Sequence, residues 1–167
     1  MLRRAFTTGM KMRFYSTTGR ALAEPAAAGA NEFVINFCTP HAPVYSEKVV
    51  DSVTLPGSAG EYGVTHGHAP IISQLEAGVV TVYLLGGTVE KYFVPGGFAV
   101  TKADSVTDIS VPEAVPVEDL DESAVRAAHA EATSAVSSSA EGSVAKATAM
   151  IEVHVASAMG RALGIKL

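Results

Sequence analysis

The chain of 167 residues contains few of the residues that form crosslinks, bind nucleic acids or span membranes. It has one cysteine, Cys38, so an intrachain disulfide is excluded. Cys38 lies in an apolar run without basic neighbours, which predicts a small buried side chain rather than a reactive thiolate. No apolar run approaches the ~20 residues that a membrane-spanning helix needs.

Positive charge is also scarce. Lysine and arginine number 12 against 17 aspartate and glutamate residues, and the formal net charge is −5. A nucleic-acid-binding domain usually carries a basic excess or a basic stripe, so no nucleic-acid partner is expected. Apolar residues make up 48% of the chain and charged residues 17%, a balance that predicts an ordered protein with a hydrophobic core.

Motifs of enzyme active sites are missing as well. The sequence contains no Gly-x-Ser-x-Gly elbow, no phosphate-binding Gly-x-x-x-x-Gly-Lys and no Gly-x-Gly-x-x-Gly fingerprint. The acidic cluster 118–122 is better explained by helix-terminus electrostatics than by acid–base chemistry. No catalytic residue and no cofactor are therefore expected.

Two histidines leave one enzymatic alternative open. His66 and His68 are two residues apart, which on a strand places both on one face, and paired histidines can bind a metal ion. Their distance from Gly60 resembles the start of the cupin metal motif, but that motif needs a glutamate where this chain has Ile72 and Ser73. A small metal-dependent cupin-like protein is therefore an alternative interpretation, for which the sequence supplies only two metal ligands, His66 and His68.

The first 20 residues contain five basic side chains and many hydroxyl groups, and no acid occurs before Glu24. This composition is typical of an organellar transit peptide. We expect residues 1–15 to be removed by a cut after Tyr15, with residues 16–30 forming a flexible lead-in. The cut would remove four basic residues and change the formal net charge from −5 to −9. Chloroplast transit peptides have a similar composition.

Residues 31–112 favour β-strands. Short runs rich in β-branched and aromatic residues alternate with glycine and proline at ~8–12-residue spacing, which predicts an all-β sandwich or barrel. Strands are expected within 32–38, 44–55, 78–85, 88–94, 98–101 and 106–109. The segment 55–82 begins as a glycine-rich loop of specified shape. The residues expected to shape this loop and the later turns are Gly57, Gly60, Gly67, Pro70, Gly78, Gly96 and Gly97.

After a proline-containing linker at 113–117, residues 118–167 predict an antiparallel hairpin of two alanine-rich helices. Asp119 or Asp121 is expected to cap the first helix, and Gly164 stands where the second should end. Because alanine buries little area, the hairpin should depend on another surface for stability. The faces expected to be buried are Val125, Ala128, Ala132 and Ala135 in the first helix, and Val144, Ile151, Val155, Ala158 and Met159 in the second.

Several motifs together resemble one family. They are Leu55-Pro56-Gly57-x-x-Gly60-Glu61-x-Gly63-Val64, then Gly67-His68-Ala69-Pro70, and Phe93–Phe98, where Pro95 replaces the serine of a Ser-Gly-Gly-Phe turn. The chain resembles, over residues ~32–163, the delta subunits of mitochondrial ATP synthases and their bacterial epsilon counterparts.

The resemblance implies a ten-stranded β-sandwich followed by a helical hairpin. It implies a non-catalytic central-stalk subunit of the rotor, which links the gamma subunit to the c-ring and supports proton-driven ATP synthesis. The expected partners are gamma, the c-ring and the very small mitochondrial epsilon subunit, on the matrix side of the mitochondrial inner membrane. A carboxylate and a histidine of bacterial relatives approach the c-ring, and they match Glu61 and His68. The c-ring-docking loop is accordingly expected to contain Glu61, Tyr62, Gly63, His66 and His68.

A regulatory nucleotide-sensing subunit is the other alternative within this family. Some bacterial relatives bind ATP through Ile/Leu-Asp-x-x-Arg-Ala at the start of the first helix. Here Leu120-Asp121 is followed by Arg126, two positions further along than the motif requires. Two positions on a helix correspond to ~200° of rotation, so Arg126 should point away from the group that Asp121 addresses.

Overall fold

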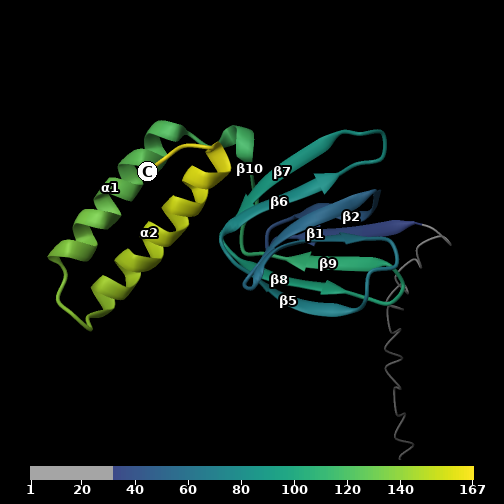
Figure 1. Ribbon diagram of the computed structural model, residues 1–167, viewed down its shortest axis with the longest axis horizontal. Helices are drawn as coiled ribbons and strands as arrows, with labels where there is room; N and C mark the ends of the chain where they lie inside the picture. The colour runs from purple at the N-terminus through teal and green to yellow at the C-terminus, as the bar shows by residue number, and fades with distance from the viewer. Residues whose placement is uncertain (1–31) are drawn as a thin grey trace, which may run out of the picture.

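The computed structural model describes residues 32–167, which form a β domain followed by two helices (Figure 1). The predicted transit peptide at 1–15 and the predicted lead-in at 16–30 lie outside the described residues. Figure 1 shows the two helices beside one end of the β domain.

Ten strands form one continuous sheet among residues 32–167. The strands are β1 (Phe33–Cys38), β2 (Pro43–Val50), β3 (Ser52–Gly57), β4 (Gly60–Thr65), β5 (Ile71–Leu75), β6 (Gly78–Tyr83), β7 (Val89–Val94), β8 (Gly97–Thr101), β9 (Val106–Ser110) and β10 (Val115–Pro116). Their order is β10-β7-β6-β3-β5-β8-β9-β1-β2, and β4 pairs with β3 outside this path. β1 and β9 are parallel, and the other pairs are antiparallel.

Strand β3 connects two layers of the sheet. Its first half, Ser52–Thr54, pairs with β6, and its last residue, Gly57, pairs with Leu75 of β5. One layer therefore contains β10, β7, β6, β3 and β4, and the other contains β5, β8, β9, β1 and β2. The arrangement confirms the predicted β-sandwich followed by a helical hairpin.

The run 44–55, expected as a single strand, is divided at Asp51 into β2 and β3. The run is divided because its two halves pair with strands of different layers. β2 bonds to β1 in one layer, whereas β3 bonds to β6 in the other, so the chain must bend between them. Asp51 is exposed at this bend, and its N–H donates to the carbonyl of Tyr83 at 2.9 Å.

The core lies between the layers and is built from alternating strand residues. In β1, Phe33, Ile35 and Phe37 are buried, and alternation places the next residue, Cys38, on the outer side. Cys38 is exposed, so the prediction of a buried cysteine was wrong. The other residues of this core are Val50, Val53, Leu55, Val64, Leu75, Val80, Val82, Val94, Ala99, Ile109 and Val111.

Three polar side chains join the two layers across the edge formed by β2 and β7. The Tyr45 hydroxyl of β2 donates to the Glu90 carboxylate of β7, and the Tyr92 hydroxyl donates to the same oxygen at 2.9 Å. The rings of Tyr45 and Tyr92 meet edge to face with centroids 6.0 Å apart, and the ring of Phe37 meets Tyr92 in the same way at 5.6 Å. Such pairs contribute about 0.5–1.5 kcal/mol beyond area burial.

A short 3₁₀ turn, η1 (Val117–Asp119), leads to α1 (Glu122–Ser138) and α2 (Val144–Leu163). Asp121 caps α1 by accepting from the N–H of Ser123 at 2.8 Å. Gly164 ends α2 with φ 71°, as its place in the sequence predicts. Within the segment expected as a linker, Val115 and Pro116 form β10 on the edge of β7.

The predicted buried face of the second helix was partly wrong. Val144 and Ile151 are 83% and 64% exposed, whereas Ala158 is buried as predicted, together with Ala149, Ala156 and Gly160. In α1, Ala128 is exposed as well. Small residues let the two helix backbones approach closely, so the larger side chains lie outside their contact.

The hairpin packs on the β domain through a second, smaller cluster. Phe93 of β7 and Ala77 are buried against Ala158 of α2, with Val155 and Met159 packed beside them. After α2 the chain folds back on the helix. Leu167 lies so close to Gly160 that a Cβ on Gly160 would be 2.5 Å from Leu167 Cδ1. The C-terminal residues therefore cover the last turns of their own helix.

We predict that Phe93→Ala destabilises the protein by about 3–5 kcal/mol, because it removes a fully buried ring that serves both the β domain and the hairpin. Urea unfolding measures this change. Phe98→Ala is the matched control, since Phe98 is 58% exposed and its loss should cost less than about 0.5 kcal/mol. Equal losses for the two variants would contradict the packing role of Phe93.

Candidate functional site

The segment 55–82, which the sequence predicts to begin as a loop, is mostly strand. It contains the end of β3, all of β4 and β5, and β6 up to Val82. β3 and β4 form a hairpin in which Gly57 pairs with Gly60 across the two-residue turn Ser58–Ala59. Gly57 is needed here because a Cβ would come 2.9 Å from Cε1 of Tyr62. The expectation of a loop was wrong because the glycines permit close turns between strands rather than an open connection.

Strand β4 carries the first group of expected docking residues. Leu55 and Tyr62 face each other in the register, as do Pro56 and Glu61. Tyr62 packs against the core, and its hydroxyl is buried with no hydrogen-bond partner in the described part of the chain. Glu61 is exposed, and the exposed Gly63 has no atom within 4 Å of the place where a Cβ would stand.

The two histidines lie in the turn after β4 rather than on a strand. Gly67 between them has φ 73°, and its N–H donates to Ser105 Oγ at 3.0 Å. The N–H of His68 donates to the carbonyl of Thr65 at 3.1 Å. His66 is exposed, and His68 is partly buried with Nδ1 2.7 Å from the carbonyl of Ala69.

These positions bear on the metal alternative. Among residues 32–167 no three side chains of histidine, cysteine, aspartate and glutamate are grouped to hold a metal ion. His66 and His68 thus have no third protein ligand in this part of the chain, and they do not share a strand face.

Ser105 was not expected as a site residue. It is buried with φ 63°, its hydroxyl accepts from Gly67, and its carbonyl accepts from the N–H of Val34 at 3.1 Å. It therefore holds the His66–His68 turn against the β8–β9 turn and the start of β1. No pattern in the sequence indicates this contact, because Gly67 and Ser105 are 38 positions apart.

The structure separates the expected docking residues into two groups. Glu61, Tyr62 and Gly63 belong to the end of β4 next to the hairpin turn, and His66 and His68 follow its other end. Five strand residues rise about 17 Å, so Glu61 does not meet the histidines. A partner that contacts both groups must extend along β4.

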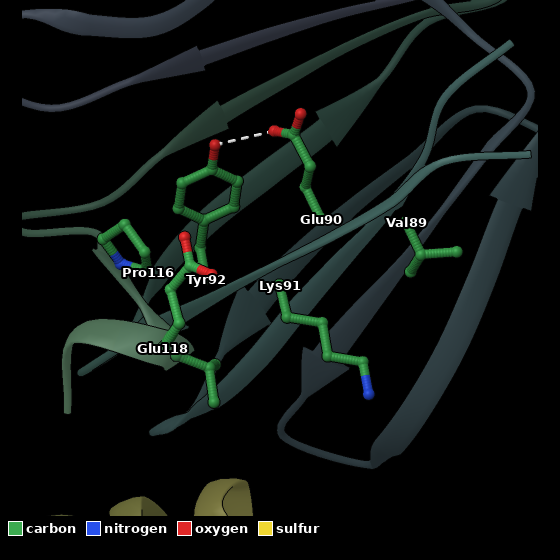
Figure 2. A pocket seen from close by; sticks show the side chains of 7 residues that line it. Val89, Glu90, Lys91, Tyr92, Pro116 and Glu118 are labelled. Atoms are coloured by element: carbon green, nitrogen blue, oxygen red, sulfur yellow. Dashed lines mark hydrogen bonds between the residues drawn. The ribbon is translucent and has the colours of Figure 1, made fainter.

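Two surface hollows are relevant to the site. One borders β4, and the other borders the contact between β2 and β7. A groove of about 390 Å³ lies between the β3–β4 hairpin and β5, lined by residues 57–62 and 71–74. A second hollow of about 490 Å³ lies between β7 and η1. Figure 2 shows its lining, with the bond between Tyr92 and Glu90 and with the Glu118 carboxylate near the Tyr92 ring.

The contact of Tyr45, Glu90 and Tyr92 between β2 and β7 determines which groups of the second hollow are charged. Hydrogen bonds from Tyr45 and Tyr92 lower the pKa of Glu90, so its carboxylate stays ionised. Burial, and then the hydrogen bond to Glu90, raise the pKa of Tyr45 far above its usual value, and burial also raises the pKa of Tyr92. No pattern in the sequence indicates this cluster, because its members lie on strands that are distant along the chain.

The residues considered for nucleotide sensing have local partners. Asp121 accepts from Ser123 and Ala124 as the cap of α1, and these bonds lower the pKa of its carboxyl group. Arg126 donates to Glu122 at 2.8 Å and to the carbonyl of Lys166 at 3.0 Å. Asp121 and Arg126 therefore do not converge on a common ligand.

The β domain matches a family model described as "ATP synthase, Delta/Epsilon chain, beta-sandwich domain" over residues 32–117. The chain belongs to the ATP synthase delta/epsilon family. Curated relatives extend the similarity into the helices. The "ATP synthase subunit delta, mitochondrial" of Caenorhabditis elegans is 40% identical over 86% of this chain and 88% of its own length. The "ATP synthase F(1) complex subunit delta, mitochondrial" of Dictyostelium discoideum is 34% identical over 87% and 85%.

Chains in two solved structures of mitochondrial ATP synthases share the fold. A chain in the cryo-EM structure of the Euglena gracilis mitochondrial ATP synthase, containing OSCP, F1 and c-ring, has a TM-score of 0.75 at 25% identity and covers 98% of this chain and 99% of its own. A chain from the central stalk and c-ring of the Tetrahymena thermophila enzyme shares the fold, with a TM-score of 0.56 at 13% identity. Among the described residues, no helix is long and apolar enough to cross a membrane.

The lowered pKa of Glu90 predicts a specific acid sensitivity. Below its ordinary value of 4.5, the unfolded chain binds a proton that the folded chain still excludes, so acidification favours unfolding. We expect the free energy of unfolding to fall between about pH 5 and about pH 3, and to fall less steeply in Glu90→Gln. Urea titrations across this range measure both slopes, and parallel slopes would refute the role of Glu90.

Proposed function

We propose that the chain is the delta subunit of a mitochondrial rotary ATP synthase. It is a central-stalk component of the rotor, links the gamma subunit to the c-ring, and supports proton-driven ATP synthesis without catalytic residues of its own. The observation that carries this proposal is the 40% identity to a mitochondrial delta subunit over 86% of the chain, a share that extends beyond the sandwich into the helices.

The architecture suits a part that transmits torque. Tyr45, Glu90 and Tyr92 tie the two layers together, and Phe93 joins the hairpin to the β domain. The first contact resists shear between the two layers of the sandwich, and the second resists movement of the hairpin against the β domain. A torque applied to one face of the subunit is therefore transmitted to its other contacts with little internal deformation. Shape-complementary contacts over a wide area suit such transmission better than one strong ion pair.

The c-ring contact is proposed for Glu61, Tyr62, Gly63, His66 and His68. Glu61 is exposed on β4, where its carboxylate can meet a cationic or polar group of the ring. The histidine turn lies about 17 Å further along. The docking surface is therefore elongated, with a carboxylate at one end and imidazoles at the other.

The proposed location is the matrix side of the mitochondrial inner membrane, where the chain is peripheral and held through the c-ring. The basic, acid-free start of the sequence supports import into the organelle. The very small epsilon subunit is proposed to pack against the hairpin, where Val144, Met150 and Ile151 present exposed apolar side chains.

Native gel electrophoresis of mitochondria from the source organism tests the proposed function. Antibody against the chain should detect it in the ATP synthase band, and N-terminal sequencing of that species should begin at Ser16. A chain found only as a free monomer would refute the assignment to the complex, and an intact Met1 would refute the cut after Tyr15.

We predict that Glu61→Lys weakens coupling between proton flow and ATP synthesis, because it puts a cation against the polar groups that the carboxylate meets. ATP-driven proton pumping by the purified complex should fall severalfold while the subunit still folds and assembles. Glu113→Lys is the matched control, since Glu113 is exposed and lies outside the docking surface. Full coupling and full c-ring retention in Glu61→Lys would contradict the proposed contact.

A further inference from the structure

The hairpin of α1 and α2 is connected directly at one end only. The short connection between Ser138 and Val144 joins the helices there, whereas the start of α1 and the end of α2 meet at the other end, beside the β domain. The residues that α2 buries are alanine and glycine, which contribute little apolar area. The open end of the hairpin therefore needs contacts other than helix packing to stay together.

The last four residues of the chain, 164–167, cross this open end, and we call them the C-terminal strap. They leave α2 through a left-handed turn, in which Gly164 has φ 71° and the N–H of Ile165 donates to the carbonyl of Gly160 at 2.9 Å. The turn reverses the chain, and Figure 1 shows the yellow C-terminal segment running from the end of α2 to α1. Terminal residues are poorly ordered unless contacts hold them.

The side chain of Leu167 packs at a position on α2 that only glycine leaves open. Ala149, Ala156 and Gly160 are buried, and their helical spacing places them on one face of α2. At Gly160 the nearest atoms belong to the strap, because a Cβ there would lie 2.5 Å from Leu167 Cδ1 and 3.6 Å from Ile165 Cγ1. Leu167 is 42% exposed, so more than half of this terminal side chain is covered.

Arg126 of α1 holds the strap from the other side. Its Nε and Nη2 donate to one oxygen of Glu122 at 3.0 and 2.8 Å, which orients the guanidinium group, and its Nη1 donates to the carbonyl of Lys166 at 3.0 Å. A charged donor makes the stronger kind of hydrogen bond, but exposure to solvent moderates it here. Because Lys166 is 40 positions from Arg126, this bond links the two helices at their open end.

We propose that the C-terminal strap closes the open end of the helical hairpin, with Arg126 holding its backbone and Gly160 receiving its last side chain. With the strap in place, α1 and α2 form one unit. When the strap is released, the end of α2 separates from the start of α1 while the sandwich stays folded, as in other local openings of weakly packed elements. This inference goes beyond the proposed function, because it concerns an equilibrium within the chain and requires no partner subunit.

Amide-resolved hydrogen exchange of the purified full-length chain tests the strap with a change on one helix and a readout on the other. Arg126→Ala alters α1, and we expect the amides of residues 159–163 in α2 to exchange about threefold faster. Lys146→Ala is the matched control, because it breaks an ion pair with Glu141 at the connected end of the hairpin. It should leave these amides unchanged, and equal acceleration by both variants would overturn the role of Arg126.

Gly160→Ala reverses the arrangement, with the change on α2 and the readout on α1. Alanine is the better helix former, so a purely local effect would stabilise α2 and would not accelerate exchange in α1. The added methyl group instead displaces Leu167 and releases the strap. Since an isolated helix as short as α1 is marginal in water, we expect the amides of residues 126–130 to exchange about threefold faster. Unchanged or slower exchange there would overturn the proposal.

Deletion of residues 165–167 removes the strap itself and should accelerate exchange at the open ends of both helices roughly tenfold. The core strands β1 and β6 should keep their slow exchange, and acceleration there as well would show general destabilisation and overturn a local device. Because Arg126 acts through the strap, adding Arg126→Ala to the deletion should change nothing further. A full additional effect of Arg126→Ala would overturn its role as the residue that holds the strap, and unchanged exchange after the deletion would overturn the strap altogether.

Discussion

The sandwich closes where Tyr45 of β2 meets Glu90 and Tyr92 of β7, two strands far apart in the path of the sheet. The sheet is continuous, so its two layers are joined through β3 and could otherwise separate at the other side. One carboxylate that accepts from two hydroxyls, together with edge-to-face rings, holds that side together. This closure packs against the core, and the same strand β7 pairs with β10 and carries Phe93, which receives the hairpin.

The closure also explains why the molecule has two unlike edges. Near β7 the layers are joined by side chains, and η1 and the helices continue from β10 beside it. Near β4 the layers stay apart, and strand backbone remains unpaired among the described residues. One side of the sandwich therefore serves the chain's own architecture, and the other is available to a neighbour.

Features set by neighbouring residues could be predicted from the sequence. Asp121 at the start of α1 and Gly164 at the end of α2 follow from the chemistry of helix ends, and both were found in place. Burial of helix residues could not be predicted in the same way. Val144 and Ile151 fit an apolar stripe, yet α2 buries small residues where it packs closely, with Ala158 against the β domain and Gly160 against Leu167.

The same limit applies to the site. The motif around Glu61 and His68 identified the family, but the distance between these residues depends on whether the segment is loop or strand. Glycine favours turns in either case, so the sequence did not distinguish a loop from paired strands with tight connections. Ser105 and Tyr45 gave no local signal, because each acts through residues at least 38 positions away.

Cys38 has a practical consequence. It is the single thiol of the sequence, and alternation along β1 brings it to the outer face of the sandwich. A maleimide dye would therefore attach at one defined point on a rigid strand, without mutagenesis to remove competing sites. In a rotary machine, such a label would report the angular position of this subunit directly.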